Sequence, residues 1–366
     1  MEDIPIGILV SGLGLLLGMV FGATAQRTNF CTMGAISDIV FMGDWNRFRS
    51  WLLAMAVAIP VSQYMHLTGT VDLGKSIYLT TNLGWAGAII GGLIFGFGMT
   101  LSGGCGNKTL VRIGTGNMKS LVTAIFLGLF AYMTLRGLIG LARVEFEAAV
   151  NTDLKQMGLA SQGMADMLAA ITGLGLDTAR QALTVFFTAG LLYFCFKSPD
   201  FRNSKINIIA GLIVGLLIPA AWYTTGVIGQ DDFDPVQLTS FTFIAPTGDS
   251  LQYLMTFSGA TVNFGIATVG GVIAGSFLMG LVRGQIHYEG FNDPGDFRRN
   301  ISGGSLMGIG GVLALGCTVG QGLTGLSTLA LGSLIALIAI IAGAVYGMKY
   351  LEEGSLGGAF RALLAR

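Results

Sequence analysis

The stretch GGLIFGFGMTLSGGC at residues 91–105 matches GGSLMGIGGVLALGC at residues 303–317 without a gap, and seven of the fifteen positions are identical. The offset between the two stretches is 212 residues. Nearly the same offset aligns NFCTMGAISDIVFM (29–42) with TFIAPTGDSLQYLM (242–255). Because one offset explains both matches, we interpret the chain as two repeats of one unit.

The composition indicates an integral membrane protein. Of 366 residues, 52% are hydrophobic and only 11% are charged, and the mean hydropathy is +0.71. An ordinary soluble domain carries roughly 25% charged residues. The formal net charge is zero, which gives no reason to expect a nucleic-acid partner. The four cysteines have no C-x-x-C spacing, so we expect neither a metal site nor a cofactor.

Long apolar runs occur along nearly the whole chain, and a helix needs about 20 such residues to cross a bilayer. The runs lack the alternation of barrel strands, so the expected fold class is an all-α integral membrane protein. We place about nine transmembrane helices near residues 4–25, 47–68, 84–101, 118–140, 178–197, 206–229, 260–283, 298–316 and 327–350.

Basic residues predict the orientation, because cytoplasmic segments of membrane proteins carry an excess of Lys and Arg. With the N-terminus outside and the C-terminus inside, fifteen of the twenty basic residues fall on inner segments. They are Arg27, Arg47, Arg49, Lys108, Arg112, Lys119, Lys197, Arg202, Lys205, Arg283, Arg298, Arg299, Lys349, Arg361 and Arg366. The tryptophans Trp45, Trp51, Trp85 and Trp222 fall near predicted span ends, where we expect them at the membrane interface.

The repeat and the spans together predict inverted topology. The offset maps spans one to four onto spans six to nine, and a displacement of five spans makes the second half enter the membrane in the opposite sense. We therefore divide the chain into a first half at 1–140, a connector at 141–205 and a second half at 206–366. The connector holds span five and a segment, 141–177, that we expect to form an amphipathic helix on the outer surface. Inverted halves around a midplane site are a recurrent transporter plan.

Glycine-containing breaks interrupt the apolar runs at RTNFCTMGAISD (27–38), SGGCGNKT (102–109) and LGCTVGQG (315–322). We expect each break to be a turn that opens a short re-entrant helix. Glycine lets the backbone approach a ligand closely, and the free amides at a helix start favour an anion. Non-helical backbone at membrane depth is tolerated where it is buried or lines a cavity.

Three of the four cysteines, Cys31, Cys105 and Cys317, lie at these breaks. A single buried cysteine is usually a small hydrophobic residue, and we interpret Cys195 in this way. Three cysteines at three equivalent breaks favour a function instead. Neutral thiols are weak donors with polarizable sulfur, and they suit a soft, sulfur-bearing anion. The repeat is imperfect because Cys31 aligns with Ile244, so we expect an asymmetric pocket.

Lys108 and Arg112 follow Cys105 closely in the sequence. They can steer anions toward the inner face, or they can be ordinary cytoplasmic charges. The sequence leaves both interpretations open.

Five stretches resemble the YeeE/YedE family of bacterial inner-membrane proteins: RTNFCTMGAISD, SGGCGNKTLVRIGTGN, SFTFIAPTGDSLQYL, GFNDPGDFRRNISGG and ALGCTVGQGLTGLS. The resemblance covers essentially the whole chain. It implies a multi-pass protein of the inner membrane, with a compact inverted-repeat fold dented on both faces, that takes up thiosulfate through a narrow centre where three cysteines contact the ion in turn. The expected substrate-binding residues are Phe30, Cys31, Thr32, Gly104, Cys105, Gly106, Asn107, Gly316, Cys317, Thr318 and Gln321.

The resemblance also implies a possible partner, a small cytosolic sulfurtransferase of the TusA-like, YeeD type. Alternatives remain at the level of sequence. Some members of the family are associated with selenium metabolism, so the substrate can be a selenium or another sulfur compound. The chain can also be a membrane sulfurtransferase that passes a persulfide to a TusA-like acceptor, or a channel for small neutral solutes.

Overall fold

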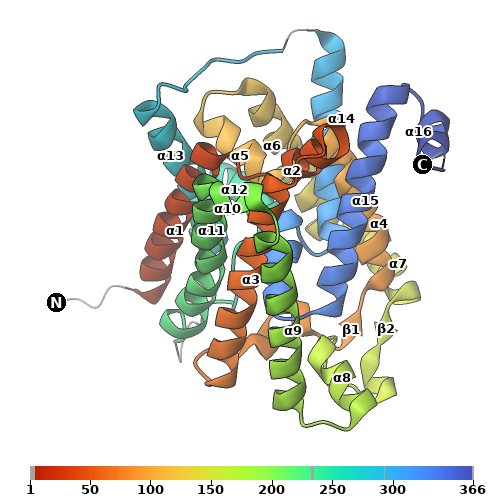
Figure 1. Ribbon diagram of the computed structural model, residues 1–366. Coiled ribbons are helices and arrows are strands. Elements are labelled where there is room, and N and C mark those ends of the chain that lie inside the picture. Colours follow the sequence, from red (N-terminus) through yellow and green to blue (C-terminus); the bar gives the residue numbers. More distant parts are fainter. Residues whose placement is uncertain (1–4, 232–234, 292, 365–366) are drawn as a thin grey trace.

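The computed structural model describes residues 5–231, 235–291 and 293–364, and most of them lie in helices (Figure 1). The only regular strands in these ranges are two of two residues each. β1 (Asn82–Leu83) and β2 (Thr152–Asp153) pair antiparallel, with Asn82 opposite Asp153. The expected all-α class is therefore confirmed.

Each of the nine predicted spans coincides with a long helix. These helices are α1 (Ile6–Thr28), α3 (Asn46–Leu67), α4 (Trp85–Leu101), α6 (Met118–Arg136), α9 (Leu176–Phe196), α11 (Lys205–Tyr223), α13 (Phe264–Val282), α14 (Pro294–Leu313) and α15 (Leu331–Glu353). Within the described ranges, seven of them are long and apolar enough to cross a membrane; α3 and α14 are the two that fall short. Both start with a charged turn, NRFR in α3 and PGDFRR in α14.

Shorter helical segments lie between the long helices. They are α2 (Thr32–Ser37), η1 (Asp38–Met42), η2 (Leu73–Lys75), η3 (Ile77–Leu79), α5 (Gly106–Gly114), α7 (Leu138–Val150), η4 (Leu154–Met157), α8 (Met164–Thr172), α10 (Pro199–Asn203), η5 (Thr224–Ile228), α12 (Ile244–Met255), η6 (Phe257–Gly259), η7 (Gly320–Gly325) and α16 (Leu356–Leu364). Figure 1 shows α2, α5 and α16 near one end of the long helices, and β1, β2 and α8 near the other end.

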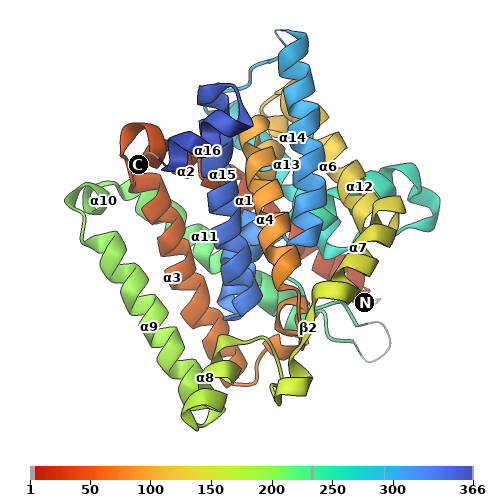
Figure 2. The same cartoon turned by 90° about the vertical axis from the view of Figure 1, so that its right-hand side faces the viewer.

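The long helices pack in pairs: α1 with α13, α3 with α11, α4 with α15 and α6 with α14. Helices α4 and α14 also contact each other, while α9 packs on α3 at the edge of the bundle (Figure 2). Small residues let the paired backbones approach closely, as in other membrane bundles. A Cβ atom on Gly22 of α1 would lie 2.2 Å from the carbonyl oxygen of Val272 in α13.

The segment 141–177 does not form one amphipathic helix, so this expectation was wrong. It contains the end of α7, the strand β2, the 3-10 turn η4 and the helix α8. Two polar tethers explain the breaks. The pairing of β1 with β2 ends α7, and the backbone N–H of Met164 donates to the carbonyl oxygen of Leu329 at 2.8 Å. These long-range backbone bonds leave no signal in the periodicity of the segment itself.

Two of the four tryptophans lie inside the protein and not at its lipid-facing surface, which corrects that expectation. Trp51 and Trp222 are 1% and 0% exposed. The Trp222 ring donates to Ser327 Oγ at 3.0 Å, and the Trp51 ring stacks on Phe30 with centroids 6.0 Å apart. An indole at a helix end can face the protein as well as the interface, and tertiary packing decides between them.

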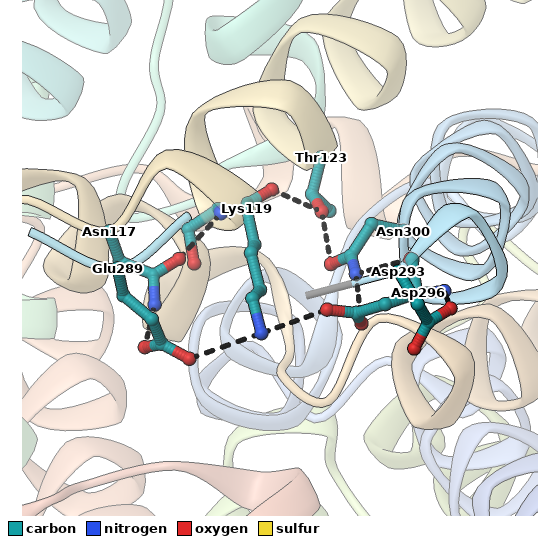
Figure 3. Close-up of polar contacts among 8 residues, drawn as sticks. Asn117, Lys119, Thr123, Glu289, Asp293, Asp296 and Asn300 are labelled. Carbon is teal, nitrogen blue, oxygen red and sulfur yellow. Dashed lines mark hydrogen bonds and ion pairs between the residues drawn. The ribbon is translucent and has the colours of Figure 1, made fainter. Parts of the chain in front are cut away.

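A polar network joins the start of α6 to the start of α14 (Figure 3). The Lys119 ammonium contacts Asp296 at 2.8 Å and Glu289 at 3.3 Å, and Asn117 also hydrogen-bonds Glu289. Asn300 accepts a hydrogen bond from Thr123 at 3.0 Å. The motif GFNDPGDFRRNISGG therefore anchors two long helices to each other at one end of the bundle.

Candidate functional site

Cys31 and Cys105 meet in the interior although 74 residues separate them in the sequence. Their sulfur atoms lie 3.4 Å apart, and the two side chains are 4% and 0% exposed. Each is the residue immediately before a short helix, Cys31 before α2 and Cys105 before α5. The two thiols therefore lie where two helix N-termini converge.

Residues with a left-handed backbone conformation end the two long helices and so allow this convergence. Asn29 ends α1 with φ +53°, and its side chain is of the type that tolerates this region. Gly103 has φ +68° in the turn after α4. Each turn ends a long helix and lets the chain restart as a short one. The sequence singled out Gly104 in this break, but the positive φ that requires glycine belongs to Gly103.

Polar groups surround the thiol pair. The Cys105 thiol donates to Asn107 Oδ1 at 2.6 Å, and Asn107 Nδ2 donates to the carbonyl oxygen of Phe30 at 3.3 Å. Backbone groups of Gly34 and Thr32 in the first turn of α2 also lie beside the two sulfurs. The hydroxyl of Thr32 is buried and has no hydrogen-bond partner. Polar groups of the side chains and of the backbone therefore surround the sulfur atoms of Cys31 and Cys105.

Asn107 connects Cys105 to the backbone next to Cys31, so its replacement should make the positions of the two thiols less well defined. We expect Asn107→Leu, which keeps the size but removes both hydrogen bonds, to slow substrate passage by roughly tenfold, the effect of one or two lost hydrogen bonds. Uptake by purified protein in liposomes measures this effect. Asn82→Leu is the control, because Asn82 is an exposed asparagine of β1 that lines neither of the cavities beside the cysteines. An Asn107→Leu protein with full uptake would contradict this role.

Cys317 lies 212 residues after Cys105 and has a similar local structure. It precedes a short helical segment that starts at Thr318 and continues into η7, and it is 1% exposed. The backbone N–H of Gly320 donates to its sulfur at 3.4 Å. Leu315 has φ +57°, the conformation of Gly103 at the same position of the first half, and Gly316 has φ +157°. Cys317 therefore also lies at a helix start after a left-handed turn.

Polar atoms near Cys317 lack partners. The Gln321 side-chain amide donates to the carbonyl oxygen of Ala314, but its own Oε1 is buried and unpartnered, as is the hydroxyl of Thr318. A small cavity of about 20 Å³ touches Gln321, Tyr78 and Gln162. A buried polar atom without a partner costs free energy, which is consistent with a place that a ligand passes.

Phe243 and Ile244 separate the two cysteine sites. Phe243 precedes α12, is 0% exposed, and lies with its backbone beside the Cys317 sulfur. On the other side, a Cβ atom on Gly106 would lie 3.8 Å from Phe243 and 3.5 Å from Ile244. The predicted residues thus form two groups, one around Cys31 and Cys105 and one around Cys317. The sequence alignment paired Phe243 and Ile244 with Phe30 and Cys31 but did not identify them as this barrier.

A cavity of about 730 Å³ opens at the end of the bundle where α2 and α5 lie, and Cys31 forms part of its wall. Polar residues dominate the lining, among them Asn29, Arg47, Lys108 and Arg112. Arg47 crosses α2 here, donating to Asp38 Oδ2 at 2.9 Å and to the carbonyl oxygen of Asn29 at 2.9 Å. Sequence reasoning missed Asn29 and Arg47; their only signal is their place beside the cysteine motif.

The fourth cysteine belongs to neither group. Cys195 is buried near the end of α9, and its thiol donates to the carbonyl oxygen of Arg49 at 3.3 Å. Phe201 and Leu53 complete its apolar surroundings. It fills space between helices, as the sequence indicated.

Residues 27–346, which include Cys31, Cys105 and Cys317, match the family described as sulphur transport. The chain belongs to the sulphur transport family. This result confirms the resemblance to YeeE/YedE proteins. Two members of similar length are named thiosulfate transporter TsuA. The Escherichia coli (strain K12) protein is 24% identical over 327 residues, 85% of this chain and 86% of the relative.

The second, from Spirochaeta thermophila, is 28% identical over 318 residues, 86% of this chain and 90% of the relative. A shorter match, 36% over 104 residues, joins the chain to a protein of Escherichia coli (strain K12) named probable transporter YedE, with 28% and 23% of the two chains covered. The relatives of this chain are thus named as transporters. The chain itself is a multi-pass membrane protein.

Proposed function

We propose that this chain carries thiosulfate inward across the bacterial inner membrane. The observation that carries the proposal is the pair of thiols, Cys31 and Cys105, that meet at 3.4 Å between two helix N-termini, where Cys31 also lines a polar cavity. Two relatives that match over most of their length are named thiosulfate transporters. The site and the family lead to the same class of substrate.

The chemistry of the ion suits this site. Thiosulfate has a soft terminal sulfur and three hard sulfonate oxygens, so thiols can contact the first while backbone N–H groups face the negative charge. Neutral thiols hold an anion less tightly than a lysine or arginine would, because the S–H group is a weak donor and carries no charge of its own. A transport site must release its ion, and weak donors in series allow this. We propose the same role for Thr32, Asn107, Thr318 and Gln321, whose polar groups lie beside the three sulfurs.

The ion's route follows from the order of these groups. From the outer side it passes Gln321 and Tyr78, reaches Cys317, crosses the barrier of Phe243, and meets Cys105 and Cys31 before it enters the cavity of 730 Å³. Phe243 is fully buried between the two sulfur sites.

We propose that the chain is an inverted repeat of nine spans, divided into 1–140, 141–205 and 206–366, with its N-terminus outside. Three observations support this. The pairing of α1 with α13 is repeated by α11 with α3, and the pairing of α4 with α15 is repeated by α14 with α6. Gly103 and Leu315, 212 residues apart, share a left-handed backbone. The cavity that holds Lys108 lies at the end rich in basic residues, which the charge rule places inside.

Uptake of radiolabelled thiosulfate into liposomes that contain the purified chain tests the proposal. We expect intact thiosulfate inside, weak competition by sulfate, and no release of sulfite. Sulfite release together with a gain in mass on one cysteine would instead support a sulfurtransferase, in which a thiolate takes the terminal sulfur as a persulfide. Solute flux that thiosulfate does not inhibit would support a channel for neutral solutes. Preferential uptake of a selenium compound would show that this compound, and not thiosulfate, is the substrate.

A TusA-like sulfurtransferase is the partner that we propose for the inner face. The reasoning is chemical, because an acceptor thiolate can attack the terminal sulfur of thiosulfate in the cytosol, forming a persulfide and releasing sulfite. If such an acceptor removes the ion at the inner cavity, its addition inside the liposomes should increase the rate of uptake. An unchanged rate would show that the two proteins act separately.

A further inference from the structure

Lys108 is a buried cation that no carboxylate neutralises within the residues that the structure describes. Its side chain lies on α5 and only 9% of the residue is exposed. Its ammonium donates to Asn29 Oδ1 at 2.9 Å, and it forms no ion pair with any acid in the described part of the chain. Lysine is almost never this buried unless it is paired. Other basic residues of the same end, such as Lys205 and Arg298, are exposed, so an ordinary cytoplasmic charge does not explain its position.

Arg112 adds a second unneutralised charge one helical turn further along α5. It lines the same cavity as Lys108, and its guanidinium donates to the carbonyl oxygen of Gly103 at 3.0 Å. It too lacks an acidic partner among the residues that the structure describes. Residues four apart lie on one face of a helix, so α5 presents both cations to the cavity.

The acids of the cavity are used elsewhere. Asp38 pairs with Arg47 at 2.9 Å, and Asp44 accepts from the backbone N–H of Asn46 at 2.8 Å. Asp44 is also exposed, so water screens its charge. The wall near Lys108 and Arg112 is therefore positive, and Cys31 lies in the same wall.

We propose that Lys108 and Arg112 form an oxyanion subsite beside Cys31, which holds thiosulfate by both ends as it leaves the thiol pair. This subsite rests on the proposed function for its substrate. The sulfonate oxygens contact the two cations, and the terminal sulfur contacts the Cys31 thiol. Asn29 holds the ammonium toward the cavity, so Lys108 needs little reorganisation to bind.

The geometry explains how thiosulfate differs from sulfate at this place. Sulfate offers only hard oxygens, so it can use the two cations but gains little from the soft sulfur of the Cys31 thiol. Thiosulfate uses both and binds more tightly. A change at Lys108 should therefore weaken both anions, whereas a change at Cys31 should weaken thiosulfate alone.

Equilibrium dialysis of radiolabelled thiosulfate against the detergent-purified full chain tests the subsite, with unlabelled sulfate as competitor. We expect Lys108→Met to raise the dissociation constant of thiosulfate and the inhibitory constant of sulfate by roughly tenfold or more, the effect of a lost charged hydrogen bond. Lys108→Arg should keep both constants within about threefold, because it keeps the charge. Lys205→Met is the matched control, since it removes an exposed charge at the same end, and both constants should be unchanged.

Cys31→Ala completes the test. It should raise the thiosulfate constant and leave the sulfate constant unchanged. Equal constants in Lys108→Met and wild type would overturn the subsite, even if the wild type transports thiosulfate. Conversely, if liposomes show no transport but Lys108→Met still weakens both anions, the subsite holds and the transport proposal fails.

A further readout needs no variant and serves if Lys108→Met does not fold. Raising the sodium chloride concentration should increase the inhibitory constant of sulfate for the wild type, because chloride competes for the cations. A flat response would show that backbone amides at the thiols, and not the two cations, hold the anion.

Discussion

Replacement of Cys31, Cys105 or Cys317 by alanine should reduce thiosulfate uptake by roughly tenfold to a hundredfold, because each change removes a buried donor to a charged ion. The effect should be largest for Cys105, whose thiol is fully buried and contacts both Cys31 and Asn107. Two measurements apply: uptake into liposomes, and growth on thiosulfate of a host that lacks its other sulfur importers.

Cys195→Ala is the matched control, because Cys195 is equally buried but donates to Arg49 in an apolar cluster. Uptake should stay at the wild-type level. Serine variants separate the two properties of a thiol: serine keeps a donor but loses the soft sulfur, so we expect partial activity. Full uptake in all three alanine variants would remove the cysteines from the mechanism.

Gly22→Leu should prevent the chain from accumulating as a folded protein. A Cβ atom at this position would lie 2.2 Å from the carbonyl oxygen of Val272, and the obstacle is backbone of α13 that cannot rotate away. Overpacking against side chains costs about 1–3 kcal/mol, and a clash with backbone costs more because a whole helix must shift. We therefore expect little monodisperse protein in gel filtration, and a lowered unfolding temperature for any that is recovered.

Gly12→Leu on the same helix is the control, since nothing lies within 4 Å of its added Cβ. Its unfolding temperature and yield should match the wild type. Gly275→Leu tests the same crossing from the partner helix, where the added Cβ would lie 2.0 Å from the carbonyl oxygen of Met19. If Gly22→Leu and Gly275→Leu both fold normally, then close approach of α1 and α13 is not what holds this pair together.

The long helices were predictable from sequence because hydropathy and length are local properties. Each of the nine predicted ranges overlaps a long helix. The largest difference at the end of the first half is that α6 ends at Arg136 and not at 140, because the chain breaks at Gly137 and α7 follows. The positions of the cysteines at helix starts also followed from local signals, the glycine and asparagine turns before them. The segment 141–177 was not predictable in this way, because its breaks depend on β1 and on Leu329, which are distant in the sequence.

The sequence by itself determined that the chain forms apolar helices long enough for a membrane, that two of its stretches match at an offset of 212 residues, and that three cysteines lie at breaks in the apolar runs. Only the tertiary structure decided which of them meet. Cys31 contacts Cys105, while Cys317 lies beyond Phe243. Tertiary structure also decided that Lys108 is buried in the wall of a cavity and does not extend from the outer surface of the protein. The physical reason is the distance along the sequence. A turn or an apolar run depends on residues that are adjacent in the sequence, whereas the meeting of two cysteines depends on how helices from distant parts of the chain pack together.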